Sequence, residues 1–353
     1  MSAVKPVDPV NPVNPVNALN ASIEGFPIAH WNERGVTAWA LAPLAALFRV
    51  VVAMRRLAYR ISLATPVRLS VPTIVVGNFT VGGAGKTPLT IALVDALRAR
   101  GWQPGVVSCG YGGSGRGVRA VGPTSDPRID GDEPVLIARR TGVPGYVGAD
   151  RSAAALALLR EHPTVNVLLC DDGLQHLRLG RDIEIAVVDR RGYGNGMLLP
   201  AGPLRELPRP VDALVRNGDA PPEALPEGEF AMTLDPDQFT LVHEPSIRID
   251  RAMLNGRRLH AVAGIGSPAR FFDTLRALGL HFAEHPFPDH HAYIERDLAF
   301  ADCDYILMTE KDAVKCAQFG RRDLISLAVS ARIDERLIAL VLDRLQRIVT
   351  ATA

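Results

Sequence analysis

The stretch Gly77–Thr87, GNFTVGGAGKT, decides the expected fold of this 353-residue chain. It follows a short apolar segment, Thr73–Val76, and precedes a segment of helical composition that runs from Thr87 to about Arg100. Successive backbone N–H groups in a glycine-rich turn form an anion-binding nest, to which the N-terminus of a following helix adds its positive end. A strand, a glycine-rich loop and a helix in this order predict a phosphate-binding loop.

The loop differs at one position from the strict pattern G-x-x-x-x-G-K-[ST], because Thr80 stands where the first glycine is expected. In this variant, Lys86 is expected to reach the β- and γ-phosphates of a nucleotide, and the Thr87 hydroxyl is expected to bind Mg²⁺. A tight turn with a chance Gly-Lys-Thr is the alternative. The residues expected around the phosphates are Thr80, Val81, Gly82, Gly83, Ala84, Gly85, Lys86 and Thr87.

Apolar segments alternate with helical ones along the rest of the chain. Continuous apolar runs joined by helices predict a parallel sheet that is covered on both faces, so the expected fold class is α/β. A Pro-, Gly- and acid-rich stretch, Asn217–Glu229, predicts a boundary between a P-loop domain over residues 35–218 and a second, smaller α/β domain over residues 219–353. The further expected strands are Gly105–Ser108, Val165–Cys170, Ile183–Asp189, Leu259–Gly264 and Tyr305–Thr309.

The N-terminal part of the chain has two distinct characters. Residues 1–34 begin with a Val-Asn-Pro repeat that cannot bury an apolar face, so a disordered extension is expected there. Residues 36–60 form an apolar run with tryptophan near its start and arginine at its end. This pattern favours a helix in the membrane interface over a core helix, and a spanning helix is least favoured because Pro43 and Arg49 interrupt the run.

Composition and charge exclude several classes of protein. Apolar residues make up 47% and charged residues 22%, which is typical of a globular chain. The formal net charge of +1 gives the chain no overall positive potential that would attract nucleic acid, so no nucleic-acid partner is expected. The four cysteines form no C-x-x-C pair, which argues against a disulfide scaffold or a zinc ribbon.

Acidic residues stand at two places where a phosphate-binding loop needs them. The apolar strand that ends at Cys170 is followed by Asp171 and Asp172, at the edge where an open α/β sheet places its ligands. Asp171 suits Mg²⁺ binding, directly or through water, and Asp172 suits the orientation of the metal ligands or the substrate. Either carboxylate could instead cap a helix. Asp132 and Glu133 in DGDEP are, from sequence alone, ordinary acids at a helix start.

The segment Phe287–Tyr293, FPDHHAY, holds two adjacent histidines beside Asp289. Three interpretations stay open. The residues could form a loop cluster that only satisfies its own hydrogen bonds, a metal site, or an Asp–His contact at an active site. The spacing alone does not decide whether His290 or His291 faces a site. Arg205, in the loop LPAGPLRE, is a further potential phosphate contact through its planar guanidinium.

Taken together, these segments resemble the tetraacyldisaccharide 4′-kinase family of Gram-negative bacteria. The resemblance covers the chain from about Gly35 to Lys315. Its motifs, in order, are TVGGAGKT (Thr80–Thr87), GYGG (Gly110–Gly113), GDEP (Gly131–Pro134), GADR (Gly148–Arg151), DDGLQH (Asp171–His176), RDIEI (Arg181–Ile185), GNGMLLPAGPLRE (Gly194–Glu206), AGIGSPARFF (Ala263–Phe272), FPDHHAY (Phe287–Tyr293) and TEKDAVK (Thr309–Lys315).

The resemblance implies transfer of the γ-phosphate of ATP, with Mg²⁺, to the 4′-hydroxyl of an acylated disaccharide 1-phosphate, giving lipid IVA. It implies Asp132 as the catalytic base, aided by His290, with Asp171 and Asp172 on the metal side and Lys86 on the phosphates. It also implies a peripheral or monotopic protein at the cytoplasmic face of the inner membrane. No obligate protein partner is expected.

One departure from the family pattern is Cys109, which stands where the family usually has arginine. Arg116 or Arg119 could replace that charge; otherwise, the binding of substrate or nucleotide phosphate is expected to be weaker.

The rival function is a membrane-recruited P-loop ATPase switch. Val81 argues against this rival, because partitioning ATPases with a similar loop place a lysine at that position, and the N-K-x-D pattern of GTPases is not found either.

Overall fold

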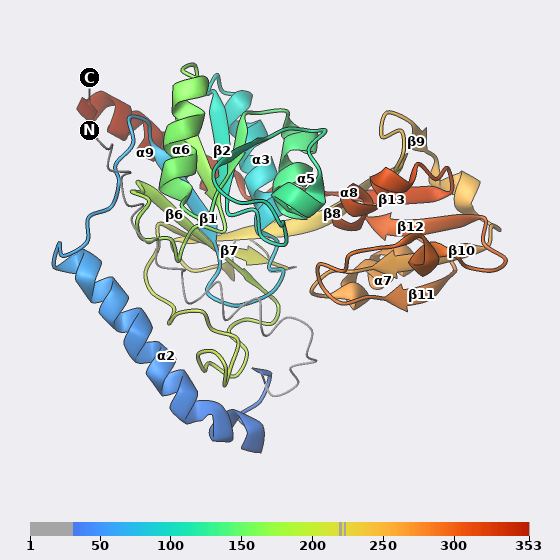
Figure 1. Cartoon of the computed structure of the whole chain (residues 1–353), viewed down its shortest axis with the longest axis horizontal. Helices are drawn as coiled ribbons and strands as arrows, with labels where there is room; N and C mark the ends of the chain where they lie inside the picture. The colour runs from blue at the N-terminus through green and yellow to red at the C-terminus, as the bar shows by residue number, and fades with distance from the viewer. Residues whose placement is uncertain (1–30, 219–220, 222–223, 353) are drawn as a thin grey trace, which may run out of the picture.

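The computed structural model describes residues 31–218, 221 and 224–352 (Figure 1). In this part of the chain the strands are β1 (Thr73–Gly77), β2 (Pro104–Ser108), β3 (Arg119–Val121), β4 (Gly145–Val147), β5 (Val167–Asp171), β6 (Ile183–Asp189), β7 (Ala213–Asn217), β8 (Glu229–Leu241), β9 (Arg248–Ile249), β10 (Leu259–Ala263), β11 (Phe282–Pro286), β12 (Tyr305–Thr309) and β13 (Leu324–Ile333). The α-helices are α2 (Val36–Arg60), α3 (Lys86–Arg98), α4 (Pro127–Asp130), α5 (Asp132–Thr141), α6 (Arg151–Glu161), α7 (Pro268–Ala277), α8 (Glu310–Cys316) and α9 (Glu335–Thr352).

The described strands form one continuous 13-stranded sheet in the order β11-β10-β12-β13-β8-β7-β6-β1-β5-β2-β4-β3, with β9 paired to β8. Neighbouring strands are parallel except in the pairs β8–β13, β3–β4 and β8–β9. Helices cover both faces of the sheet, because its strands are apolar on both sides. The predicted α/β fold with a large parallel sheet is confirmed.

Strand β1 lies in the middle of the sheet between β5 and β6, and all five of its residues are buried. Its register pairs Val76 with Asp171, so the acidic end of β5 lies beside the start of the phosphate-binding loop. On one face, α3, α5 and α9 pack against the sheet. On the other face, α6 and part of α2 do so. The fold therefore brings the predicted loop and the predicted acids to one edge.

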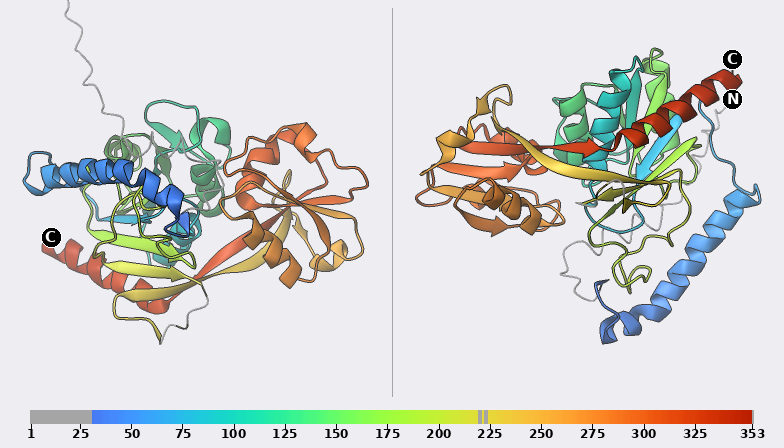
Figure 2. Two further views of the ribbon diagram at one scale, coloured as in Figure 1. Left: turned by 90° about the horizontal axis from the view of Figure 1, so that it is seen from below. Right: turned by 180° about the vertical axis from the view of Figure 1, so that it is seen from behind.

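Two α/β units share this sheet. The first unit contains β1–β7, α3–α6 and α9, and the second contains β9–β12, α7 and α8; β8 and β13 pair antiparallel and run through both (Figure 2). The chain returns from the second unit through β13 into α9, which packs in the core of the first unit. The second unit is thus an insertion in the first, whereas the sequence placed everything after residue 219 in one domain.

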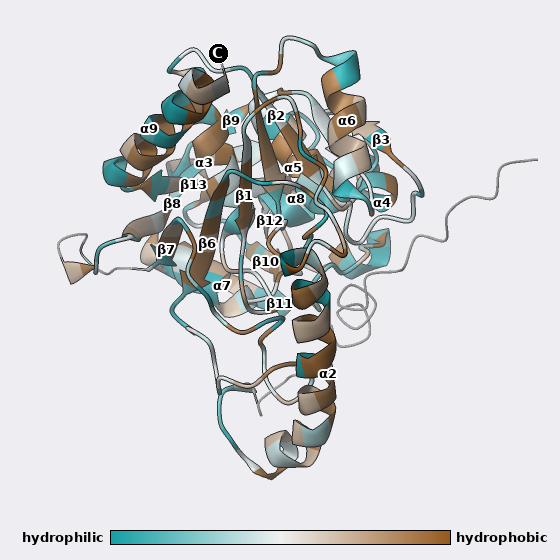
Figure 3. Ribbon diagram, turned by 90° about the vertical axis from the view of Figure 1, so that its left-hand side faces the viewer, coloured by the Kyte–Doolittle hydropathy of each residue, from teal (hydrophilic) through white to brown (hydrophobic). Residues whose placement is uncertain are grey.

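Helix α2 forms over the range expected from the sequence and extends away from the rest of the first unit (Figure 1, Figure 3). It is the one described helix that is long and apolar enough to cross a membrane by length and composition, and few of its side chains are buried. Most of the expected N-terminal extension, residues 1–30, lies outside the described residues. Trp31 and Arg34, at the end of that expected extension, contact the loop at 195–200, with Trp31 Nε1 donating to the Pro200 carbonyl at 3.1 Å.

The position of α9 gives a stability prediction. Leu345 is fully buried against the sheet of the first unit. Replacing it with alanine should lower the free energy of unfolding by about 2–5 kcal/mol, because the substitution removes buried methyl groups and leaves a cavity. Equilibrium unfolding in urea measures this. The matched control is Val349→Ala on the exposed face of the same helix, with an expected change of about 0.5 kcal/mol or less. Equal effects of the two substitutions would contradict the packing of α9 described above.

Candidate active site

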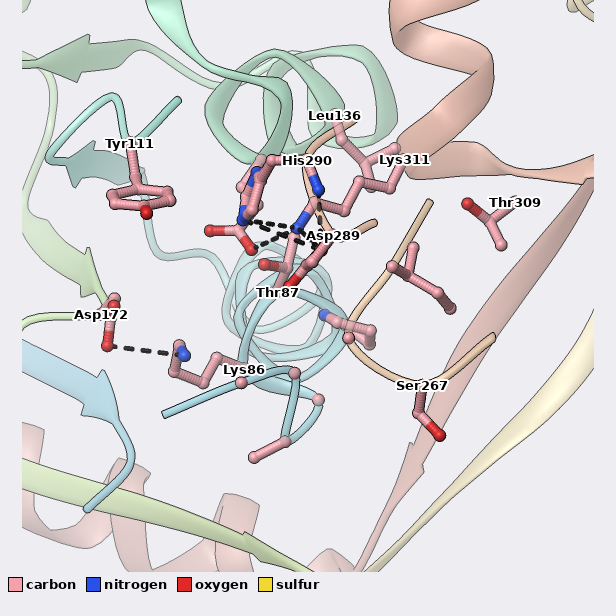
Figure 4. Close-up of a pocket in the computed structure, with 18 of the residues that line it drawn as sticks. Lys86, Thr87, Tyr111, Leu136, Asp172, Ser267, Asp289, His290, Thr309 and Lys311 are labelled. Carbon is pink, nitrogen blue, oxygen red and sulfur yellow. Dashed lines mark hydrogen bonds and ion pairs between the residues drawn. The ribbon is translucent and has the colours of Figure 1, made fainter. Parts of the chain in front are cut away.

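A cavity of about 280 Å³ lies where the two units meet at the carboxyl edge of the sheet (Figure 4). The first unit contributes the loop Gly82–Thr87 to its wall, and the second contributes the start of α7 and the segment that contains His290. The units approach each other closely here: a Cβ added at Gly266 would lie 3.2 Å from the backbone N of Gly83. The predicted phosphate loop and the predicted histidine therefore share one cavity.

The phosphate-binding loop has the backbone that such a loop needs. Gly82 and Gly85 have φ of +96° and +100°, in the left-handed region that glycine adopts without steric cost. A Cβ at Gly85 would lie 2.6 Å from Nδ2 of Asn217, which donates a hydrogen bond of 2.8 Å to the Ala84 carbonyl. At Gly83 an added Cβ would meet no atom within 4 Å, so the loop is open toward the cavity. This geometry fits an anion-binding nest.

Lys86 lies at the start of α3 with its ammonium held above the loop. Its Nζ donates to Oδ1 of Asn78 at 3.2 Å and lies 3.5 Å from Oδ1 of Asp172 (Figure 4). Arg205 binds the same carboxylate, with Nη1 at 2.8 Å from each oxygen. Burial alone would raise the pKa of Asp172, but Arg205 and Lys86 outweigh it and hold that pKa well below its usual value. Asp172 is therefore ionised and fixes both cations at the phosphate loop.

Asp171 is fully buried and bonded to α3. Thr87 Oγ1 donates to its Oδ2 at 3.3 Å and Thr90 Oγ1 donates to its Oδ1 at 2.9 Å. Burial, together with the charge of Glu133, raises the pKa of Asp171 to about 7. A hydroxyl and a carboxylate oxygen side by side at a phosphate loop fit Mg²⁺, which uses few protein ligands and takes the others from water and phosphates. Among the described residues, no group of three or more His, Cys, Asp or Glu side chains is placed to hold a metal ion.

Asp132 and His290 come together from different units. Asp132 is the first residue of α5 and is buried; its Oδ1 accepts a hydrogen bond from the Glu133 N–H, and its Oδ2 lies 3.1 Å from Nδ1 of His290. On the other side of the ring, Nε2 lies 3.2 Å from Nζ of Lys311, which also binds Oε1 of Glu133 at 3.2 Å. Figure 4 shows His290 and Lys311 side by side on one wall of the cavity.

One member of this pair lines the cavity and the other does not. His290 lines the cavity, whereas Asp132 lies behind it and is not part of the wall. The adjacent His291 turns away, because its Nε2 is bonded to Oδ2 of Asp297 at 2.8 Å and its ring packs on Phe287. The structure therefore answers a question that the sequence left open: of the two histidines, His290 faces the site.

Several residues at the site had no role in the sequence analysis. Lys311 is the second residue of α8, in a motif whose charge could have attracted attention, whereas Asn78 and Asn217 carry no sequence signal of their own. Cys109 lines the cavity, and burial raises the pKa of its thiol. Neither expected substitute for the missing arginine lines this wall: Arg119 binds Asp130 at 2.7 Å, and Arg116 is exposed.

The Asp132–His290 contact gives a pH prediction. Burial lowers the pKa of His290, as does the charge of Lys311, but the hydrogen bond that the ring donates to Asp132 and the charges of Asp132 and Asp289 together outweigh them, so the net shift is upward. A raised pKa in the folded state means that protonated His290 stabilises the protein fully below its unfolded pKa of about 6.5, and that this stabilisation is lost as pH rises through the higher folded pKa. The unfolding free energy of the wild type minus that of His290→Asn should therefore fall as pH rises above about 6.5.

Urea unfolding at several pH values measures this difference. His281→Asn, at an exposed histidine of the second unit, is the matched control and should show no such fall. A difference for His290→Asn that grows with rising pH would contradict the sign of the shift.

Comparisons with known proteins agree with this geometry. The sequence model of the family described as tetraacyldisaccharide-1-P 4′-kinase matches residues 37–346. The tetraacyldisaccharide 4′-kinase of Azoarcus sp. (strain BH72) is 51% identical over 324 residues, which are 90% of this chain and 95% of the relative. That of Methylobacillus flagellatus is 50% identical, over 92% and 98% of the two chains.

Among solved structures, a crystal structure of an "apo" form of LpxK from Aquifex aeolicus in complex with ATP matches with a TM-score of 0.74 and 27% sequence identity. The match covers 87% of this chain and 99% of that one. The family match spans most of the residues that form both units and the cavity between them. The chain therefore belongs to the tetraacyldisaccharide-1-P 4′-kinase family.

Proposed function

We propose that this chain transfers the γ-phosphate of ATP to the 4′-hydroxyl of tetraacyldisaccharide 1-phosphate, giving tetraacyldisaccharide 1,4′-bisphosphate (lipid IVA). The observation that carries the proposal is one cavity with a phosphate-binding loop on one wall and His290, bonded to Asp132 behind it, on the other, in a chain of this family. The alternative, an ATPase switch, is not favoured, because relatives of about 50% identity over nearly their full length are kinases.

Asp132 and His290 act in this proposal as one unit that removes the proton of the acceptor hydroxyl. The pKa of Asp132 is lowered: burial would raise it, but Lys311 and His290 outweigh burial, so the carboxylate is charged at neutral pH. His290 is the member that reaches the cavity, and Asp132 orients its ring through Nδ1. In a loose phosphoryl-transfer transition state, orienting the nucleophile matters more than strong basicity, which suits an imidazole ring held in place by a carboxylate.

The phosphate side of the reaction belongs to the first unit. The loop Thr80–Thr87 would bind the ATP phosphates, and Lys86 would neutralise charge on the transferred group while Asp172 and Arg205 hold its ammonium in place. Thr87 and Asp171 would hold Mg²⁺, which supplies charge neutralisation between the phosphates. As phosphorus bonds to the acceptor oxygen, its bond to the bridging oxygen of ADP breaks, and the hydroxyl proton goes to the Asp132–His290 unit.

The test is an assay with γ-labelled ATP, Mg²⁺ and detergent-dispersed tetraacyldisaccharide 1-phosphate, beside samples without lipid and samples with excess EDTA. Label on the lipid, dependent on both lipid and Mg²⁺, is the expected result. Label released only as free phosphate, at a rate that does not depend on lipid, would refute the proposal in favour of the ATPase switch.

In the same assay, Asp132→Asn should lower kcat by about 10²–10⁴-fold, the usual contribution of a positioned acid or base. The dissociation constant for ATP should stay within about twofold of the wild-type value, because Asp132 lies away from the phosphate loop and a group that acts in the transition state alone lowers kcat. Asp302→Asn, at an exposed acid of the second unit, is the control that should keep full activity. A kcat for Asp132→Asn close to that of the wild type would remove Asp132 from the proton transfer.

We also propose that α2 attaches the protein to the cytoplasmic face of the inner membrane, as a peripheral or monotopic protein. Large apolar side chains follow one another at helical spacing along its length and are exposed, including Val36, Leu47, Val50, Met54 and Ile61. Burial of such a row in the headgroup region of a bilayer would bring the enzyme to a substrate whose acyl chains lie in the same bilayer. Arginine residues near the C-terminal end of the helix suit anionic headgroups.

Met54→Glu should reduce binding to vesicles that contain anionic phospholipid by about tenfold or more. The substitution would place a charge in the row of apolar side chains that is proposed to enter the bilayer. Flotation of the protein with vesicles measures the bound fraction. Met253→Glu is the matched control, since Met253 is another largely exposed methionine, in the second unit. Equal loss of binding in both variants would contradict a role specific to α2.

A further inference from the structure

Lys315 is a buried lysine outside the cavity wall, at the place where the two units meet. It lies on α8, which packs against α5 of the first unit, and it is 9% exposed. Its ammonium lies close to two carboxylates, one from each unit: Nζ is 2.9 Å from Oδ1 of Asp312 and 3.9 Å from Oδ2 of Asp132. Because a lysine removed from water is costly unless it is paired, these two carboxylates allow α8 to bury one here.

Asp312 fixes the position of Lys315 in the second unit. It is completely buried, and its Oδ2 accepts hydrogen bonds from the Gly264 N–H at 3.0 Å and from Thr309 Oγ1 at 2.7 Å. A Cβ added at Gly264 would lie 3.1 Å from Oδ1 of Asp312 and 3.0 Å from Oη of Tyr293, so a side chain there would crowd both. The ammonium of Lys315 also lies 5.2 Å from the centre of the Tyr293 ring, at a cation–π distance. The lysine is therefore held by a carboxylate that is bonded to the ends of both β10 and β12.

Three positive or hydrogen-bonding groups of the second unit surround Oδ2 of Asp132. It lies 3.1 Å from Nδ1 of His290, 4.0 Å from Nζ of Lys311 and 3.9 Å from Nζ of Lys315. Lys311 and Lys315 are four residues apart on α8, so they lie on one face of that helix and approach the same carboxylate. Other charged side chains nearby are bound elsewhere: Asp130 to Arg119, Glu133 and Asp289 to Lys311, and Glu310 to Arg140.

The two lysines have different surroundings. Lys311 lines the cavity, where several acidic side chains share its charge. Lys315 does not line the cavity, and its charge is shared by Asp132 and Asp312. Burial would raise the pKa of the Asp132 carboxylate. Lys311, with smaller contributions from His290 and Lys315, outweighs burial and lowers this pKa. Lys315 thus acts on Asp132 from a place that the substrates do not reach.

We propose that Lys315 is a positioning residue for the phosphoryl transfer, an inference that rests on the function proposed above. Held by Asp312, its ammonium keeps the carboxylate of Asp132 charged and turned toward the second unit, and Asp132 in turn holds the ring of His290 at the cavity. The proton of the acceptor hydroxyl passes to the Asp132–His290 unit and from there to water. Because the nearby ammonium repels this proton, the unit releases it at a lower pH than it would without Lys315.

The experiment measures kcat as a function of pH, with γ-labelled ATP and tetraacyldisaccharide 1-phosphate at saturation, for the wild type and Lys315→Met. A cation within about 4–6 Å lowers the pKa of an acid by about 1–3. Because Asp312 shares the charge of Lys315, the acid limb of the variant should lie about one pH unit above that of the wild type. Lys315→Arg, which keeps the charge, should restore the wild-type limb. KM for ATP should stay within about twofold in both variants, because Lys315 is not part of the cavity wall.

Arg258→Met is the matched control. Arg258 is an exposed cation of the second unit that pairs with Asp304 at 2.9 Å. It lies directly before β10, at the opposite end of that strand from Gly264. Removal of its charge should leave the acid limb where the wild type has it.

Thermal unfolding distinguishes positioning from a structural role. Lys315→Met leaves Asp312 buried without its cation, so this variant should unfold at a lower Tm. Combining Lys315→Met with Asp312→Asn removes the ion pair as a unit, while an amide oxygen can still accept the Gly264 N–H. The double variant should have a higher Tm than Lys315→Met alone. Its acid limb should still lie above that of the wild type, because Lys315 is the cation beside Asp132.

An acid limb at the wild-type position in Lys315→Met or in the double variant would overturn the proposal, whatever the Tm. A limb shifted equally in Lys315→Arg or in Arg258→Met would overturn it as well. An active wild type with these results refutes this inference alone, whereas a wild type that phosphorylates no lipid would refute the proposed function and this inference with it.

Discussion

The hydrogen bonds from Thr87 and Thr90 to the buried Asp171 are the interaction on which the site depends. They join the start of α3 to the end of β5 and so fix the phosphate loop against the carboxyl edge of the sheet. A buried carboxylate is unfavourable in itself, as its raised pKa reflects, and the two hydroxyl donors and the nearby Lys86 reduce this cost. The central position of β1, with Val76 opposite Asp171, makes the contact possible.

The remaining chemistry is divided between the two units. The first supplies the phosphate loop and Asp132, and the second supplies His290 and Lys311 across the cavity. The Asp132–His290 bond is thus a contact between units, and it forms because β8 and β13 run through both units as a single antiparallel pair. A continuous sheet holds the two halves of the site in register, which a flexible linker would not do.

Sequence reasoning succeeded where a function is encoded locally. The strand, loop and helix around Lys86 were predicted because the pattern of glycines and apolar residues is contiguous, and the same holds for the acids after β5. It failed where position depends on pairing between distant segments. The choice between His290 and His291 is set by a left-handed turn with φ of +58° at His290, and the contact of Lys311 with that ring spans separate segments of the second unit.

The return of α9 to the first unit has a consequence for biosynthesis. A ribosome releases the chain from its N-terminus, so α2 and the strands of the first unit emerge long before α9. The core of the first unit lacks Leu337, Val341 and Leu345 until α9 has been synthesised. The second unit, whose strands are complete earlier, can pack before the first unit that surrounds it in the sequence. The nascent protein therefore closes the core of the first unit only once α9 has been synthesised, with α2 already exposed.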